Sequence, residues 1–276
     1  MYARSIIIKL VIFVVGFSIV FWLVRLSGIL SLKSLNADMK SIPVLFGAGN
    51  FLFSIISGFV IQSQWHKWDT LMAATRGEVS TLRQLFIVAH HFPVKDRNDI
   101  RYHIYRYLDI YCKSFTRAKE KELLYRSKNV DEAMVEIEDT MFAASKRYPD
   151  IGTFAFTYLT RAMEYREIKL QSSSNQLTLP IRVFLLFATG SVMIGALFMP
   201  FTNLLYDYYF TLIIGSLAFG IIMIVEDFDN PFSPGIHFLS VDAHKNLLNE
   251  IHGKLESYGF DFEKAKQKEF VRGLEK

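Results

Sequence analysis

Cysteine, glycine and proline are scarce in this sequence, and their scarcity excludes several classes of protein. Cys112 is the only cysteine among 276 residues, so the chain cannot form an internal disulfide framework. The 15 glycines and 7 prolines are too few for a collagen-like or low-complexity chain. An apolar content of 51% excludes intrinsic disorder as well.

Catalytic, metal-binding and nucleic-acid-binding patterns are also absent from the sequence. The seven histidines form no His-Glu-x-x-His pattern, and no Gly-x-Ser-x-Gly, Gly-x-Gly-x-x-Gly or P-loop sequence occurs. The segment 64–180 holds 18 basic and 15 acidic residues, which is a mixed surface rather than a basic patch. The sequence therefore predicts no enzyme, no cofactor, no confident metal site and no nucleic-acid partner.

Long apolar runs are what the sequence does contain. They cover residues 5–24, 43–63, 181–201 and 208–225. A helix of about 20 residues crosses a hydrocarbon core of roughly 30 Å, so each run is long enough to span a membrane. The first run could instead be a secretory signal beginning after Arg4, but its length and the lack of a cleavage site after Val24 favour a span.

The remaining sequence is helical and polar enough to be soluble. Apolar residues recur three and four apart in stripes that begin at Met72, Ile100 and Val130, and no strand-like alternation of useful length occurs. We therefore expect an all-α membrane protein with four transmembrane helices and a cytoplasmic helical body. The expected divisions are 1–63 for transmembrane helices 1 and 2 with their loop, 64–180 for the cytoplasmic helical domain, 181–225 for transmembrane helices 3 and 4, and 226–276 for an acidic turn and a C-terminal helix.

Basic residues near the ends of the four runs predict the orientation. One side carries seven, namely Arg4, Lys9, Lys67, Arg76, Arg166, Lys169 and Arg182, and the other carries Arg25, Lys33 and Lys40. The positive-inside rule then places the N-terminus, the middle domain and the C-terminus in the cytoplasm. We expect an integral protein of a bacterial inner membrane, in contact with lipid.

The second run carries a pattern with two interpretations. Its small or polar residues are Asn50, Ser54, Ser57 and Gly58, and small residues favour close packing between membrane helices. Alternatively, the helix lines a pore. Phe51, Ile55 and Phe59 recur every four residues, and in a symmetric oligomer they would form a narrow apolar neck that can gate by dewetting.

An acidic run follows the fourth apolar run. It comprises Glu226, Asp227, Asp229, Asn230, Pro231 and Phe232. Carboxylates are unfavourable beside anionic headgroups and the carbonyls at a helix end. Three interpretations are open: the carboxylates are hydrated, they pair with arginines of the middle domain, or they bind a cation.

These features resemble bestrophins and their bacterial relatives, above all the bacterial bestrophin-like family of unknown function. Those proteins have four spans, a helical body made mainly between spans two and three, and an acidic stretch with an Asn-Pro-Phe turn after span four, as at residues 226–232 here. Gly58-Phe59 resembles the family's Gly-Phe pair in span two. Glu78 matches an acidic residue about twenty positions later.

The resemblance implies a homopentameric ion channel for small ions with one axial pore. Carried over by position, Phe51, Ile55 and Phe59 would form the neck. Ser233-Pro234-Gly235 follows the turn where calcium-activated members have carboxylates, so calcium gating is not implied. The alternative function is a non-conducting, membrane-anchored module whose helical body binds a protein partner. A membrane-embedded enzyme is the least favoured hypothesis.

Overall fold

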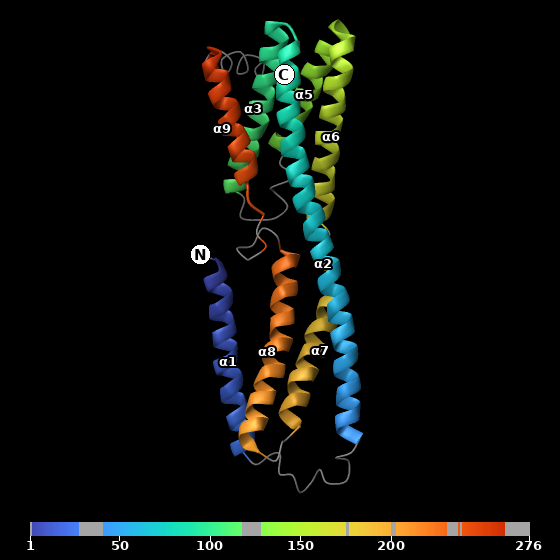
Figure 1. Cartoon of the computed structure of the whole chain (residues 1–276), viewed down its shortest axis with the longest axis vertical. Helices are drawn as coiled ribbons and strands as arrows, with labels where there is room; N and C mark the ends of the chain where they lie inside the picture. Colours follow the sequence, from blue (N-terminus) through green and yellow to red (C-terminus); the bar gives the residue numbers. More distant parts are fainter. Residues whose placement is uncertain are drawn as a thin grey trace. The chain divides into compact units, whose positions relative to one another are not determined.

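Helices account for nearly all of the described chain in the computed structural model (Figure 1). The structure describes residues 2–27, 41–117, 128–174, 177–199, 203–230, 237 and 239–262. The elements in these residues are α1 (Tyr2–Leu26), α2 (Ser41–Val88), the short 3-10 helix η1 (Ala89–His91), α3 (Val94–Arg117), α5 (Lys128–Arg147), α6 (Pro149–Ser174), α7 (Leu179–Phe198), α8 (Leu204–Asp229) and α9 (Asp242–Ser257). No strand occurs in these ranges, so the all-α fold predicted from the apolar spacing is confirmed.

Two compact units divide the chain. The membrane unit consists of residues 1–69 and 175–238, and the body unit consists of residues 70–174 and 239–276. The expected boundary between residues 63 and 64 lies inside α2, which is 48 residues long. No proline or glycine interrupts the chain between Phe59 and Arg76, so the helix continues past the end of its apolar run.

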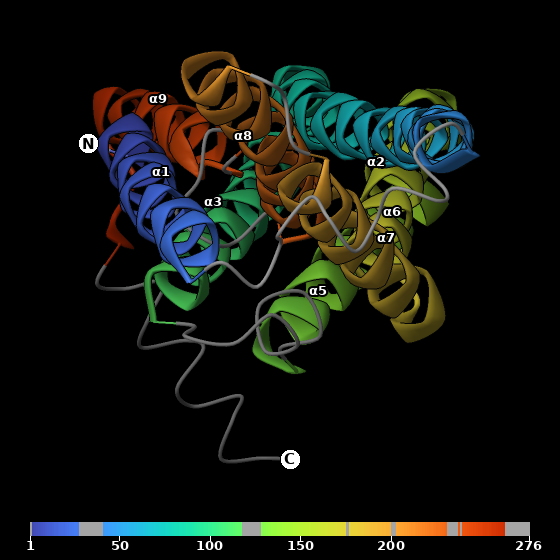
Figure 2. The same ribbon diagram turned by 90° about the horizontal axis from the view of Figure 1, so that it is seen from below.

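The membrane unit contains the four predicted spans. Helices α1, α2, α7 and α8 are each long and apolar enough to cross a membrane. Figures 1 and 2 show α8 lying between α1 and α7. Phe17 and Phe21 of α1 pack with Leu197 of α7, and Phe53 of α2 packs with Val192 of α7.

Gly215 of α8 allows α1 to approach closely. A Cβ atom at this position would lie 2.6 Å from the ring of Phe17. At the loop side of the same helix pair, Arg25 of α1 and Asp207 of α8 form an ion pair at 2.7 Å, which Asp207 makes from an almost fully buried position.

The body unit is built on the stripes predicted from the sequence. Leu82 of α2, Ile104 of α3, Ile137 of α5 and Leu247 of α9 are all fully buried. Helices α3 and α5, α5 and α6, and α3 and α9 are in contact. Each helix buries one apolar face, as expected for helices packed around a shared core.

Candidate functional site

The three residues predicted to form a pore neck share an exposed face of α2. Phe51, Ile55 and Phe59 are 66%, 40% and 72% exposed in the single chain. Their spacing of four residues aligns them along the helix axis. Large exposed apolar side chains on a membrane helix are suited to lipid, to a second subunit or to a dewetted pore.

The small and polar residues of the same helix are divided between two faces. Ser57 is only 1% exposed, and Asn50 is half-buried. Ser54 is exposed and its hydroxyl donates to the Asn50 carbonyl at 2.8 Å. Gly58 is also exposed, and an added Cβ would meet no atom within 4 Å. Packing within the chain therefore explains why a small residue occupies position 57, but it does not require a glycine at position 58.

A row of polar groups faces the inside of the membrane unit. Among the described residues, the buried atoms without a hydrogen-bond partner include Asn50 Oδ1, Ser57 Oγ, Gln64 Oε1 and Thr189 Oγ1. Asn50, Ser57 and Gln64 are seven residues apart, so they lie on one side of α2. Gln64 and Thr189 belong to no motif described in the sequence. The seven-residue spacing of Asn50, Ser57 and Gln64 is the sequence pattern that indicates this polar side of α2.

The acidic residues after the fourth span have different surroundings. Glu226 is exposed, whereas Asp229 is 2% exposed. Asp229 accepts a hydrogen bond from the backbone N–H of Leu177 at 2.6 Å and forms an ion pair with Arg182. Arg182 belongs to the first turn of α7 and not to the middle domain. It reaches Asp229 because α7 begins beside the end of α8.

Asp227 and Asn230 complete the described part of the acidic run. Asp227 contacts His237, and the backbone N–H of Asn230 donates to the Glu226 carbonyl at 3.3 Å, where α8 ends. Pro231 and Phe232 lie outside the described residues. Within the described ranges, no group of three His, Cys, Asp or Glu side chains is placed to hold a metal ion.

Glu78 is the centre of a buried polar cluster in the body unit. The Glu78 cluster consists of Glu78 on α2, Tyr107 on α3, Arg166 and Lys169 on α6, and His244 on α9. Glu78, Lys169 and His244 are fully buried. Lys169 forms an ion pair with Glu78, Tyr107 donates to the same carboxylate, and His244 Nε2 lies 3.2 Å from Glu78 Oε2.

The cluster extends toward the surface through Arg166. Its guanidinium donates to the Tyr107 hydroxyl at 3.0 Å and to Asp131 at 2.5 Å. Two cations therefore face two carboxylates, and every charge of the cluster has an opposite partner. Such balance is what allows charges to be buried in a helical core.

Burial and neighbouring charges shift the pKa values of the cluster. Burial raises the pKa of Glu78, but the Lys169 ammonium and the hydrogen bond from His244 outweigh burial and hold it well below its usual value. Burial and the Lys169 charge lower the pKa of His244, so its imidazole is neutral. With Nε2 donating to Glu78, Nδ1 is an acceptor that has no partner among the described residues.

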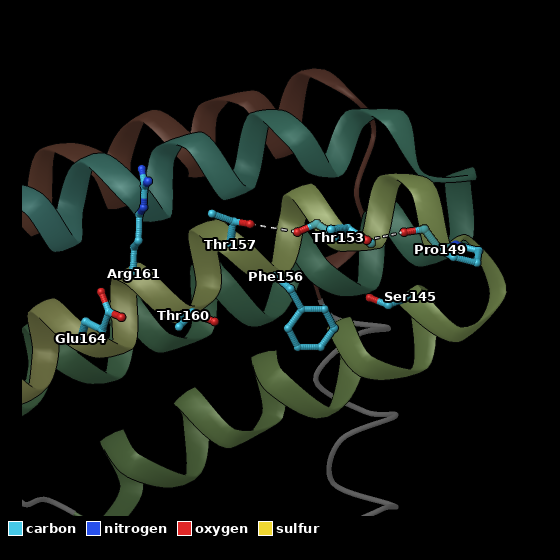
Figure 3. A pocket seen from close by; sticks show the side chains of 9 residues that line it. Ser145, Pro149, Thr153, Phe156, Thr157, Thr160, Arg161 and Glu164 are labelled. Atoms are coloured by element: carbon cyan, nitrogen blue, oxygen red, sulfur yellow. Dashed lines mark hydrogen bonds between the residues drawn. The ribbon is translucent and has the colours of Figure 1, made fainter.

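The body unit also carries an open groove along the first half of α6 (Figure 3). The groove has a volume of about 610 Å³ and is lined by Ser145, Pro149, Gly152, Thr153, Phe156, Thr157, Thr160, Arg161 and Glu164. The hydroxyls of Thr153 and Thr157 donate to helix carbonyls, each at 3.0 Å. The ring of Phe142, which is 53% exposed, lies with its centroid 6.5 Å from that of Phe156, and Phe154 on α6 is 70% exposed.

The chain combines four apolar helices, each long enough to span a membrane, with a unit of amphipathic helices. These features define its class as an integral membrane protein with four spans. A family model described as "Bestrophin-like domain" matches residues 11–237. The chain belongs to this bestrophin-like family, as the resemblance of residues 226–232 predicted. No curated protein is similar in sequence at a significant level.

Solved structures are similar in fold. One variant of a bacterial bestrophin homologue from Klebsiella pneumoniae has a TM-score of 0.71 at 10% identity, with 90% of this chain and 98% of that chain covered. A second variant of the homologue has a TM-score of 0.65 at 13% identity, with 92% and 99% covered. A structure described as a membrane protein has a TM-score of 0.69 at 12% identity, with 93% and 98% covered. At these identities the likeness establishes the fold.

Proposed function

We propose that this protein is a homo-oligomeric channel for small ions, with α2 of each subunit lining an axial pore. The observation that carries the proposal is the exposed stripe of Phe51, Ile55 and Phe59, which would form the apolar neck. Membership of the bestrophin-like family supports a channel, and the resemblance implies five subunits. The spans expose few ionisable groups, so conduction would be passive.

The same proposal includes the cellular setting. The distribution of basic residues supports a bacterial inner membrane with the termini and the middle domain in the cytoplasm. In that orientation the acidic residues Glu226, Asp227 and Asp229 stand at the cytoplasmic exit of the fourth span. Pairing with Arg182 supports a structural role for Asp229 and gives no support to a cation site.

Recording from purified protein in planar bilayers tests the channel. We expect ohmic single-channel currents, and the variant F51A/I55A/F59A should raise or deregulate them because it removes the apolar constriction. The matched control is I12A/I19A/L23A, which truncates three exposed apolar residues of α1 and should leave the current unchanged. A folded oligomer without conductance would contradict the proposal. If F51A/I55A/F59A conducts the same current as the unmodified protein, the neck lies elsewhere.

A membrane-anchored interaction module is the second candidate function. The observation that favours it is the open groove of about 610 Å³ along α6, which is lined by Phe156, with the half-exposed ring of Phe142 packed against Phe156. The oligomeric state in detergent separates the two candidates. Light scattering that gives a ring of subunits supports the channel, whereas a monomer or dimer supports the module.

A further inference from the structure

Arg101 of α3 is a buried arginine that forms no ion pair with a carboxylate in the part of the chain that the structure describes. Only 4% of the residue is exposed. Its guanidinium carbon lies 4.5 Å from the ring centroid of Phe86 on α2 and 5.2 Å from that of Tyr258, which follows α9. Its Nε donates to the Phe86 carbonyl at 3.3 Å. Two rings and a carbonyl therefore surround a full positive charge, and none of these groups is an anion.

Three further cations stand around this arginine. Arg97 lies one turn earlier on the same side of α3. Burial lowers the pKa of the Arg101 guanidinium, and the like charge of Arg97 adds to that effect. Lys254 Nζ of α9 lies 5.8 Å from the centroid of the same Phe86 ring, and Arg83 precedes Phe86 by one turn of α2. The end of α2, the start of α3 and the end of α9 thereby bring four cations together in the body unit (Figure 1).

Glu250 of α9 is the one carboxylate among the described residues that pairs with these cations. Its Oε2 lies 2.9 Å from Arg83 Nη2, and its Oε1 lies 2.8 Å from Lys254 Nζ. The hydrogen bond from Lys254 lowers the pKa of Glu250, so its carboxylate is ionised at neutral pH. Asp96 of α3 is engaged by Arg147 of α5 instead. One carboxylate therefore faces four cations.

This excess of positive charge favours an anion from solution. Burying a guanidinium without a counter-charge is unfavourable, and a bound anion reduces that cost. Guanidinium groups present paired N–H donors that match the oxygens of a phosphate, and an ammonium adds a point charge. A divalent oxyanion is favoured over a monovalent one, because its Coulomb attraction to the same cations is about twice as large.

We propose that Arg83, Arg97, Arg101 and Lys254 form a binding site for a phosphate group, carried either by inorganic phosphate or by a small soluble phosphomonoester. The half-buried Arg97 and Lys254 contact the phosphate oxygens, and Arg101 adds its charge from the buried side. Glu250 competes for Arg83 and Lys254 and thereby limits the affinity. The site lies within the body unit and does not depend on the proposed channel function.

Calorimetric titration of the full-length, detergent-solubilised protein with inorganic phosphate tests the site. At constant ionic strength we expect one saturable site per chain, and chloride at the same concentration should not saturate it. R97Q should weaken phosphate binding about tenfold or more, because it removes a charged hydrogen-bond donor. K95Q is the matched control. Lys95 is an exposed cation on another side of α3, and its loss should change the affinity by less than about twofold because solvent screens it.

E250Q provides a change of the opposite sign. It frees Arg83 and Lys254 from their carboxylate, so phosphate should bind several-fold more tightly. A merely structural role of these residues would not strengthen binding. A parallel titration with phenyl phosphate distinguishes the two sources of the group: tighter binding than that of inorganic phosphate supports a phosphomonoester, and weaker binding supports inorganic phosphate. Size-exclusion chromatography and circular dichroism verify folding of each variant.

Three results would overturn the phosphate site. They are the lack of saturable phosphate binding by the folded protein, an equal loss of affinity in R97Q and K95Q, and an affinity that E250Q leaves unchanged or weakens. If R97Q does not fold, the direction of the E250Q effect decides. Phosphate binding by a protein that conducts no current contradicts the channel proposal alone and leaves the phosphate site in place.

Discussion

At the scale of single residues, the Glu78 cluster is the part of the molecule least accessible from the sequence. Only the resemblance points to Glu78, and nothing in its neighbourhood on α2 identifies its partners. Tyr107, Lys169 and His244 come from three other helices, separated from it by 29 to 166 positions in the chain. A helical pattern shows which face is buried but not which buried polar groups meet.

Removing the Glu78 charge should destabilise the fold strongly. E78Q leaves the buried Lys169 ammonium without its counter-charge, and breaking such a pair costs about 3–5 kcal/mol. The double variant E78Q/K169M should recover most of the loss, because both charges are removed. E250Q, which breaks the partly exposed pair with Arg83, is the control and should cost less than about 1 kcal/mol. Thermal unfolding in detergent measures all three, and equal losses for E78Q and E250Q would contradict the cluster's role.

The pKa of His244 predicts how stability depends on pH. Burial and Lys169 lower this pKa in the folded chain, so the unfolded chain binds a proton first as pH falls through about 6.5. The free energy of unfolding should therefore decrease as the pH falls from about 7 to the lower pKa that His244 has in the folded chain. Below that pKa, His244 should cause no further change. H244Q should flatten that part of the curve of melting temperature against pH.

Cys112 shows the same effect in a reactive group. Burial, with the charge of Asp109 adding to it, raises the pKa of the Cys112 thiol to about 11. The thiolate is the nucleophilic form, so this cysteine is poorly reactive at neutral pH. That agrees with an interpretation of Cys112 as a structural residue of α3.

At the scale of helices, sequence periodicity predicts which segments are helical and which face each helix buries better than it predicts where each helix begins and ends. The stripes from Val79 to Phe86 and from Ile100 to Tyr111 are buried as expected, because a helix buries one face whatever it packs against. The change from apolar to polar composition near residue 63 predicts a division of the chain, whereas α2 continues through it to Val88. Composition changes where the solvent changes, whereas the backbone stops only at proline, glycine or a cap.

Gly152 is a position where α5 and α6 of the body unit approach each other closely. A Cβ at this position would lie 2.6 Å from Ser145 Cβ and 2.8 Å from its Cα, and backbone cannot move aside cheaply. G152A should therefore destabilise the fold by about 1–3 kcal/mol. G253A in α9 is the matched control: no atom lies within 4 Å of its added Cβ, and better helix propensity should stabilise slightly, by about 0.5–1 kcal/mol. Opposite signs of the melting-temperature shift confirm the close approach, and equal signs contradict it.

At the scale of the whole molecule, the candidate neck and the Asn-Pro-Phe segment illustrate what one chain can and cannot predict. The order of four spans and a helical body followed from hydropathy, and it led to the correct family. The lining of a pore depends on neighbouring subunits, which no intrachain pattern encodes. Spacing alone therefore leaves packing and pore lining as alternatives for α2. Within the single chain Ser57 is buried and Gly58 is exposed.

Membrane orientation gives a prediction for the complete chain. In a C112A background, S27C at the end of α1 and S257C at the end of α9 are both solvent-exposed positions. If the body unit is cytoplasmic, a membrane-impermeant maleimide should label S27C in intact spheroplasts and label S257C only after permeabilisation. The reverse pattern would invert the orientation, and labelling of both before permeabilisation would contradict four spans.

The two faces of α2 carry a further consequence for any water-filled path beside it. Asn50, Ser57 and Gln64 point inward with unsatisfied buried atoms among the described residues, whereas Phe51, Ile55 and Phe59 point outward on nearly the opposite side. An amphipathic helix in water has the reverse arrangement. Rotating α2 by about half a turn about its own axis would exchange the apolar side chains that face such a path for two amides and a hydroxyl. The rotation of the helix, and not its composition, would therefore determine whether water wets the path.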